Sequence, residues 1–233
     1  METKPKLLTF LDWASVALLL TATWMSLSFA PMERVMGNVQ RVFYFHVSAG
    51  WAGMIGFLLA VFAGIRYLMT KDIKWDIIGQ AGVEIGLVFS FINIVTGAIW
   101  ARPIWNTWWT WDPRLVTATV MELVYIAYLM LRQGIDDPDR RARFGAVYAI
   151  LGFVSVPLSF LSIRIWRTIH PVVIGSGDPG AEGTFDMTGD MRTTFFFALF
   201  TFTVLGITLI WHRVRLGRLT NRVEALKMEI MSS

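Results

Sequence analysis

The chain has no cysteine and little charge. Its 233 residues include no Cys, and only 16% are Asp, Glu, Lys or Arg. The missing cysteine excludes disulfide bonds, zinc-thiolate sites and a thioether link to a cofactor. Soluble domains carry about 25% charged residues, whereas here 55% of the residues are hydrophobic. This composition also excludes a disordered chain and predicts a polytopic membrane protein.

Six stretches are long and apolar enough to cross a bilayer, whose core needs about 20 helical residues. They cover residues 7–30, 43–69, 76–101, 116–132, 144–168 and 193–212. We predict an all-α integral membrane protein with six transmembrane helices in one domain, residues 1–212. The first stretch is longer than the apolar core of a signal peptide, about 7 to 15 residues, so we expect it to be retained.

The distribution of basic residues predicts the orientation of the chain. Six spans place both termini on one side, and that side carries 14 of the Lys and Arg residues against 7 on the other. Cytoplasmic loops retain Lys and Arg during insertion. Both termini are therefore expected in the cytoplasm, in a multi-pass protein of the bacterial inner membrane. The net charge of +4 then reflects topology, and no nucleic-acid partner is expected.

Residues 213–233 follow the last span and have a different pattern. Apolar residues recur there every three or four positions among charged ones: Val214, Leu216, Leu219, Val223, Leu226 and Ile230. This spacing predicts an amphipathic helix. We expect a basic cytoplasmic tail that lies at the membrane surface, or alternatively one that docks a partner subunit.

Tryptophan is concentrated in one outer loop. Five of the 11 tryptophans lie between Trp100 and Trp111. Pro103 and Pro113 bracket this segment, as residues suited to the start and the end of a short interfacial helix. Such a helix would place four side chains on one face, at i, i+3, i+4 and i+7: Trp105, Trp108, Trp109 and Asp112. The alternative is an aromatic belt that anchors the protein at the membrane interface.

Only two of the three histidines are on the same side as the tryptophans. His46 and His170 lie at the outer ends of the second and fifth spans, and His212 lies at the inner end of the sixth. Taken singly, each could be an interfacial residue with a structural hydrogen bond. Together with tryptophans and arginines they fit haem, which takes axial imidazoles, aromatic contacts and guanidinium partners for its propionates. Zinc would usually need three or four protein ligands.

The tryptophan segment, residues 105–115, resembles the signature of the haem-handling proteins of cytochrome c maturation, the CcmC, CcmF and CcsA family. The resemblance extends over about residues 40–170, including residues 82–86 and 96–100. Six spans in 233 residues are most similar to CcmC, since its relatives are usually longer. Pro113 departs from the pattern, because relatives often carry Ala there.

The resemblance implies His46 and His170 as axial ligands of the haem iron, with the tryptophan segment as the haem-binding surface. We expect haem b, bound non-covalently, and at least one outer arginine paired with a propionate. The full set of expected haem-binding residues is His46, His170, Trp105, Trp108, Trp109, Trp111, Asp112, Arg114, Arg102, Arg41 and Arg167.

The resemblance also implies a function in haem transfer. The protein would receive haem at the outer face and deliver it to a periplasmic chaperone similar to CcmE, with no covalent chemistry of its own. Further expected partners are ABC transporter subunits similar to CcmA and CcmB and a small membrane protein similar to CcmD. Two alternatives stay open: a subunit of a CcsA-like cytochrome c synthetase, and a structural transporter subunit that binds no haem.

Two acidic residues lie inside predicted spans. Glu84 and Glu122 would be costly in hydrocarbon, so each is expected to face the bundle. Each is then either a hydrogen-bonded structural acid or part of a polar lining beneath the haem site.

Overall fold

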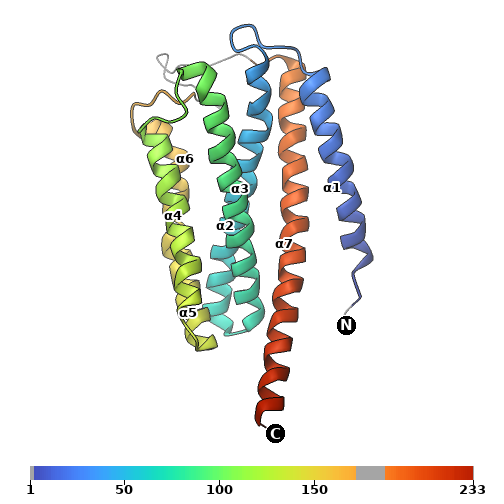
Figure 1. Cartoon of the computed structure of the whole chain (residues 1–233), viewed down its shortest axis with the longest axis vertical. Helices are drawn as coiled ribbons and strands as arrows, with labels where there is room; N and C mark the ends of the chain where they lie inside the picture. Colours follow the sequence, from blue (N-terminus) through green and yellow to red (C-terminus); the bar gives the residue numbers. More distant parts are fainter. Residues whose placement is uncertain (1–2, 172–186, 233) are drawn as a thin grey trace.

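The computed structural model describes residues 3–171 and 187–232, and its regular elements there are all helical. Figure 1 shows a bundle of long helices packed side by side. In chain order the elements are α1 (Lys6–Trp24), the π-helical turn η1 (Met25–Phe29), the 3-10 turn η2 (Asn38–Arg41), α2 (Val42–Thr70), α3 (Ile73–Trp105), α4 (Pro113–Gln133), α5 (Pro138–Gly152), α6 (Ser155–Ile165) and α7 (Gly189–Ser232).

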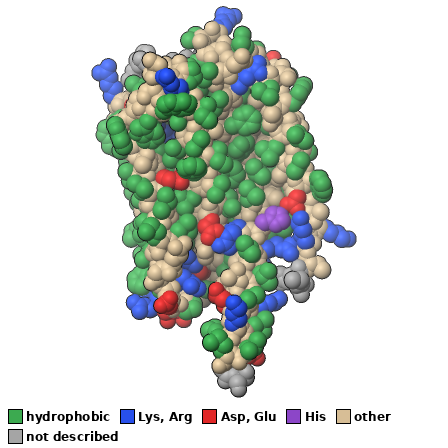
Figure 2. All heavy atoms as spheres, viewed as in Figure 1, with side chains coloured by type: hydrophobic (Ala, Val, Ile, Leu, Met, Phe, Trp, Pro, Cys, Tyr) green, Lys and Arg blue, Asp and Glu red, His purple; other side chains and the backbone are tan. Residues whose placement is uncertain are grey.

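Within residues 3–171 and 187–232, six helical segments are long and apolar enough to cross a membrane. They are Lys6–Phe29, Asn38–Thr70, Ile73–Trp105, Pro113–Gln133, Pro138–Ile165 and Gly189–Met231. Each overlaps one of the six predicted spans, which confirms the predicted all-α membrane fold. Hydrophobic side chains cover most of the flank of the bundle, and many Lys and Arg side chains lie towards its two ends (Figure 2).

The fifth span is interrupted between α5 and α6. The Ser155 hydroxyl donates to the Gly152 carbonyl at 2.6 Å, and the helix resumes at Ser155. Pro157 has no N–H and its ring clashes with the carbonyl four residues earlier, which is that of Phe153. The proline therefore explains why the span is built as two helices.

Helices α2 and α3 pack unusually closely because glycines face each other. A Cβ atom at Gly56 would lie 2.6 Å from the Gly82 carbonyl oxygen, and one at Gly53 would lie 3.1 Å from that of Gly86. The connection between the two helices is tight, with Lys71 in the left-handed region at φ 57° and Asp72 accepting from Lys74 N at 3.0 Å. The pair forms the framework on which one side of the candidate site is built.

Helix α7 runs unbroken from Gly189 to Ser232 and extends beyond the other helices (Figure 1). The tail is therefore a direct continuation of the last span, which differs from the expected helix along the membrane surface. Gly217 is the only glycine or proline after His212, and one glycine in a helix costs only about 1 kcal/mol. The segment thus contains no residue that strongly favours a bend or an end of the helix.

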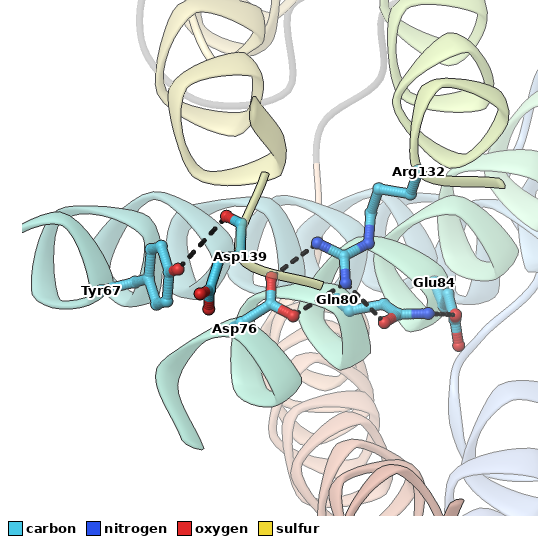
Figure 3. Close-up of polar contacts among 6 residues, drawn as sticks. All are labelled: Tyr67, Asp76, Gln80, Glu84, Arg132 and Asp139. Atoms are coloured by element: carbon cyan, nitrogen blue, oxygen red, sulfur yellow. Dashed lines mark hydrogen bonds and ion pairs between the residues drawn. The ribbon is translucent and has the colours of Figure 1, made fainter. Parts of the chain in front are cut away.

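A polar network joins three helices near the end that carries both termini (Figure 3). Arg132 donates to both Asp76 oxygens, at 2.6 and 2.8 Å, and to Gln80 at 3.0 Å. Gln80 donates to Glu84 at 2.8 Å, and Glu84 also pairs with Arg213 of α7. Glu84 thus faces the bundle and has structural partners.

Candidate functional site

The candidate site lies at the end of the bundle away from both termini, where the loop after α3 and the segment after α6 are located (Figure 1). His46 is in the second turn of α2, and His170 follows α6. Their ring centroids lie 6.5 Å apart, with an angle of 37° between the rings. The fold therefore brings together the two histidines singled out in the sequence.

His46 is fixed by contacts with α3. Its Nδ1 lies 2.9 Å from the Asn93 carbonyl oxygen, and the Asn93 side-chain amide donates to the His46 carbonyl at 2.8 Å. A Cβ atom at Gly97 would lie 2.9 Å from His46 Cε1, so only glycine leaves room for the ring. A hydrogen bond from Nδ1–H to a carbonyl assigns the proton to Nδ1. Nε2, whose polar neighbour is the Asn93 side-chain nitrogen at 3.5 Å, is then a possible metal ligand.

His170 is positioned through Asp112. The Asp112 carboxylate accepts from Thr168 Oγ1 at 2.5 Å and from Ile169 N at 3.0 Å. The Thr168 hydroxyl in turn accepts from His170 N at 3.0 Å. Asp112 also accepts from Arg114 N at 3.0 Å, which caps the start of α4. One carboxylate therefore ties the His170 segment to the tryptophan loop.

The His170 imidazole has the same arrangement as that of His46. Its Nδ1 lies 3.0 Å from the Pro171 carbonyl oxygen, which again leaves Nε2 available. Desolvation, with the nearby charge of Arg114 and the His46 ring, lowers the pKa of His170 to about 3. The imidazole is therefore neutral at physiological pH, which is the form that binds a metal.

Two hollows meet at the histidine pair. One extends to the tryptophan loop and the other to α6 and α7, and their volumes, with the adjoining space open to solvent included, are about 490 and 1550 Å³. Four residues line both: His46, Asn93, Arg114 and His170. The remaining walls include many aromatic side chains, with Trp100, Trp105, Trp108 and Trp109 in the first and Trp51, Phe160, Phe195, Phe196 and Phe200 in the second. A flat apolar group could extend to both sides of the histidines.

Arg114 is the cation at the centre of this region. Its guanidinium donates to the Ser159 carbonyl at 2.5 Å and hydroxyl at 2.9 Å, and it lies 5.0 Å from the centre of the Phe160 ring. Within residues 3–171 and 187–232 it makes no ion pair with a carboxylate. A carboxylate of a ligand could therefore form a direct ion pair with Arg114, which has only a longer-range interaction with the Asp112 carboxylate.

The predicted helix across the tryptophan loop is wrong. Helix α3 continues through Pro103 to Trp105 and ends at Asn106, which has φ 54°. The segment between Asn106 and Pro113 is not helical. Asp112 is the N-cap of α4, and a residue in that position has non-helical backbone angles.

The loop still gathers most of the expected aromatic side chains. Trp105, Trp108 and Trp109 all line the smaller hollow, and the Trp105 ring lies 6.4 Å from that of His170. Trp111 does not line either hollow, and 79% of its surface is exposed. The loop thus brings three of the four expected tryptophans to the site.

Three of the four expected arginines lie elsewhere. Arg102 donates to the Asn106 carbonyl and side chain at 2.7 and 2.6 Å, at the end of α3. Arg41 donates to the Leu27 carbonyl, and Arg167 is exposed. None of them lines either hollow. His212 pairs with Asp12, on helices α7 and α1, far from the other histidines.

Sequence reasoning missed several residues that line the hollows. Asn93 and Gly97 fix His46 from α3, and Arg164 lines the larger hollow. A polar residue inside an apolar span was a usable signal for Asn93. Arg164 precedes His170 by less than two helical turns, which was a signal for its place near the site. For Gly97 the sequence offered none, because its role depends on contact with another helix.

The ligand set fits a metal that brings its own equatorial donors. In the part of the chain that the structure describes, no three or more His, Cys, Asp or Glu side chains form a metal site. A metal–imidazole bond is about 2 Å long, so two rings on opposite sides of one metal have centroids roughly 6 Å apart. The observed 6.5 Å is close to this distance. The residues present would fit haem, with His46 and His170 as ligands of its iron.

Comparisons with known proteins place the chain in a family. The family profile described as CcmC, heme exporter protein C, matches residues 1–229. Heme exporter protein C of Bradyrhizobium diazoefficiens is 29% identical over 225 residues, which are 96% of this chain and 83% of that protein. Heme exporter protein C of Escherichia coli K12 is 31% identical over 210 residues, 88% of this chain and 82% of that protein. The chain therefore belongs to the heme exporter protein C family.

Proposed function

We propose that this protein binds haem b non-covalently at the outer face of the bacterial inner membrane and passes it to a haem chaperone for the assembly of c-type cytochromes. Membership of the heme exporter protein C family supports a role in haem transport and cytochrome c biogenesis. The six membrane-crossing segments and the bacterial relatives make it a multi-pass inner-membrane protein.

The observation that carries the proposal is the histidine pair. His46 and His170 come from distant parts of the chain, yet their rings lie 6.5 Å apart and each directs Nδ1 to a backbone carbonyl. Fixing both tautomers this way leaves the two Nε2 atoms to bind one iron.

The remaining site residues would orient the haem. Arg114 can pair with a propionate because it lines both hollows and makes no direct ion pair with a carboxylate in the described ranges. Trp105, Trp108 and Trp109 offer ring faces and edges to the macrocycle. Each aromatic contact is worth about 0.5–1.5 kcal/mol beyond its buried area, so several together hold the haem without fixing it permanently.

The chemistry of this site suits release as well as binding. Because the chain has no cysteine, no thioether can form between it and the haem. Axial bonds, ion pairing and packing would be the only attachments, and a chaperone can compete for all of them. We infer that the protein is a transfer component without covalent chemistry of its own.

The direction of transfer follows from the position of the site. The tryptophan loop and the segment after α6, which line the hollows, lie at the end opposite both termini (Figure 1), and the excess of Lys and Arg on the side of the termini supports a cytoplasmic position for them. Haem would then be presented on the periplasmic side, to a chaperone similar to CcmE. We propose subunits similar to CcmA, CcmB and CcmD as the other partners.

A transfer assay tests this function. The protein is loaded with haem in membranes and mixed with the haem-free chaperone, and delivered haem is divided by the amount of folded protein. The double variant Trp108→Ala, Trp109→Ala should deliver several-fold less haem, because two contacts of about 0.5–1.5 kcal/mol each are lost. Trp111→Ala is the matched control, since Trp111 belongs to the same loop but lines neither hollow.

The alternative is that the tryptophans only anchor the protein at the membrane interface. In that case the double variant would reduce the amount of folded protein, while delivery per folded molecule would equal that of the parent. This result would refute the proposed function of the loop and would favour a structural subunit.

A further inference from the structure

The cytoplasmic end of α7 has the spacing of a coiled-coil helix. Its apolar residues follow one another at intervals of three and four: Leu216, Leu219, Val223, Leu226 and Ile230. This is the a and d pattern of two heptads, which forms a narrow stripe along one side of a helix. The side chains of Leu216, Leu219, Val223 and Leu226 are 42% to 55% exposed.

The apolar stripe faces away from helices α3, α4 and α5, which lie on the opposite side of α7. A groove of about 1340 Å³ separates this part of α7 from α3, α4 and α5. The α7 residues that line it include Gly217, Asn221, Glu224 and Met228. At 100° per residue these lie on the side opposite the apolar stripe. The helix thus shows its small and polar side to the bundle and its apolar side to the surroundings.

The stripe continues a face of α7 that α1 already covers. Ser15 of α1 lies 3.3 Å from Thr208, and Asp12 pairs with His212 at 2.7 Å. Thr208 and His212 precede Leu216 by eight and four residues, so all three share this face. Helix α1 begins at Lys6, whereas α7 continues to Ser232. The face on which α1 packs therefore extends beyond the start of α1.

The charges beside the stripe indicate which helix could bind there. The e and g positions are Arg215, Thr220, Arg222, Lys227 and Glu229, of which three are basic. In a parallel pair of two copies, Arg222 would face Lys227 of the other chain and repel it. A helix with acidic residues at e and g would instead pair with both.

We propose that the cytoplasmic end of α7 binds an amphipathic helix of another protein, one that continues the place of α1 along α7 and carries Asp or Glu beside an apolar heptad seam. Such a helix would attach a cytoplasmic partner to the membrane bundle. The binding surface lies at the end of the molecule opposite the haem site, so its test does not depend on haem.

The proposal is tested with the full chain in nanodiscs of neutral phosphatidylcholine and a fluorescent helical peptide of three heptads. The peptide has Ile at a, Leu at d and Glu at e and g, and a matched peptide has Lys at e and g. Fluorescence anisotropy gives the two affinities. The acidic peptide should bind at least about tenfold more tightly, which corresponds to about 1.4 kcal/mol.

Two single variants locate the binding surface. Leu226→Asp places a charge in the stripe and should weaken binding of the acidic peptide about tenfold or more. Met228→Asp is the control, because Met228 is 66% exposed and lines the groove on the opposite side. Both positions are exposed, so neither change should unfold the bundle.

Three results would overturn the proposal. The first is equal binding of the acidic and basic peptides, or no binding of either. The second is equal weakening by Leu226→Asp and Met228→Asp. The third is a dimer of this chain that Leu226→Asp dissociates, since the stripe would then bind a second copy.

Discussion

Asp112 shows how one residue can shape the candidate site although it lines neither hollow. Its carboxylate caps α4 and accepts hydrogen bonds from Thr168 and Ile169. The sequence placed it on the haem-binding surface beside the tryptophans. The structure gives it a different place, as a positioning residue for His170, because the donors it needs are in a segment more than 50 residues away in the chain.

We predict that Asp112→Asn weakens haem binding while the bundle stays folded. The amide NH₂ cannot accept a hydrogen bond, so one of the donors on residues 168–169 loses its partner, at a cost of about 1–3 kcal/mol. Haem titration should show a several-fold to hundredfold lower affinity. Asp137→Asn is the control, since Asp137 caps α5 at the other end of the bundle. Equal effects of the two variants would contradict the positioning role.

A comparison of variants at Arg114 and Arg102 distinguishes a role in ligand binding from a role in local structure. Arg114 lines both hollows, whereas Arg102 binds only the end of its own helix. A hydrogen bond to a charged group is worth about 1.5–3 kcal/mol. Arg114→Gln should therefore lower haem affinity at least about tenfold and Arg102→Gln should have little effect, while Arg114→Lys should restore part of the loss. Equal retention of haem in all three would place propionate recognition elsewhere.

At the scale of helices, the contact between α2 and α3 sets the position of His46. Backbone atoms of the two helices meet at Gly56 and Gly82, and His46 is then fixed by Asn93 and Gly97. Small residues at such an interface allow close approach, which gains van der Waals contact in a membrane where no hydrophobic effect drives association.

We predict that Gly56→Ala destabilises the protein by about 1–3 kcal/mol, the usual cost of overpacking. The new methyl group would lie 2.6 Å from the Gly82 carbonyl oxygen, so the helices must separate. Thermal unfolding in detergent measures the effect. Gly206→Ala provides the comparison, because its Cβ would have no neighbour closer than 3.7 Å. Equal stability of the two variants would show that the close contact between α2 and α3 at Gly56 does not contribute to stability.

The segments that the sequence predicts correctly differ physically from the one that it predicts wrongly. A transmembrane span depends on the length of one apolar run, which is local information. Each of the six predicted spans therefore overlaps a membrane-crossing helical segment of the structure. The tryptophan loop depends on Asn106, which ends α3, and on Asp112, which binds a distant segment. Trp105, Trp108, Trp109 and Asp112 have the spacing of one helix face, but these contacts outweigh that local pattern.

At the scale of the whole molecule, the two ends are built from different polar groups. At the end away from the termini the start of α2 lies near the segment after α6 (Figure 1), and the rings of His46 and His170 in these segments lie 6.5 Å apart. Towards the other end Arg132 and Asp76 tie α4 to α3 (Figure 3), and Glu84 and Arg213 tie α3 to α7. Residue types and topology were sufficient to place both histidines at one end. They could not separate Arg114 from Arg41 and Arg167, because nearness in sequence does not give the direction in which a side chain points.

The central claim is that His46 and His170 bind the iron of one haem. Absorption spectra of the purified protein during haem titration test it most directly. The parent should give a low-spin spectrum, and His46→Gly and His170→Gly should each lose it and regain part of it when imidazole fills the vacated position. His212→Gly should match the parent, because His212 pairs with Asp12 away from the site. A parent-like low-spin spectrum in the double variant His46→Gly, His170→Gly would contradict the claim.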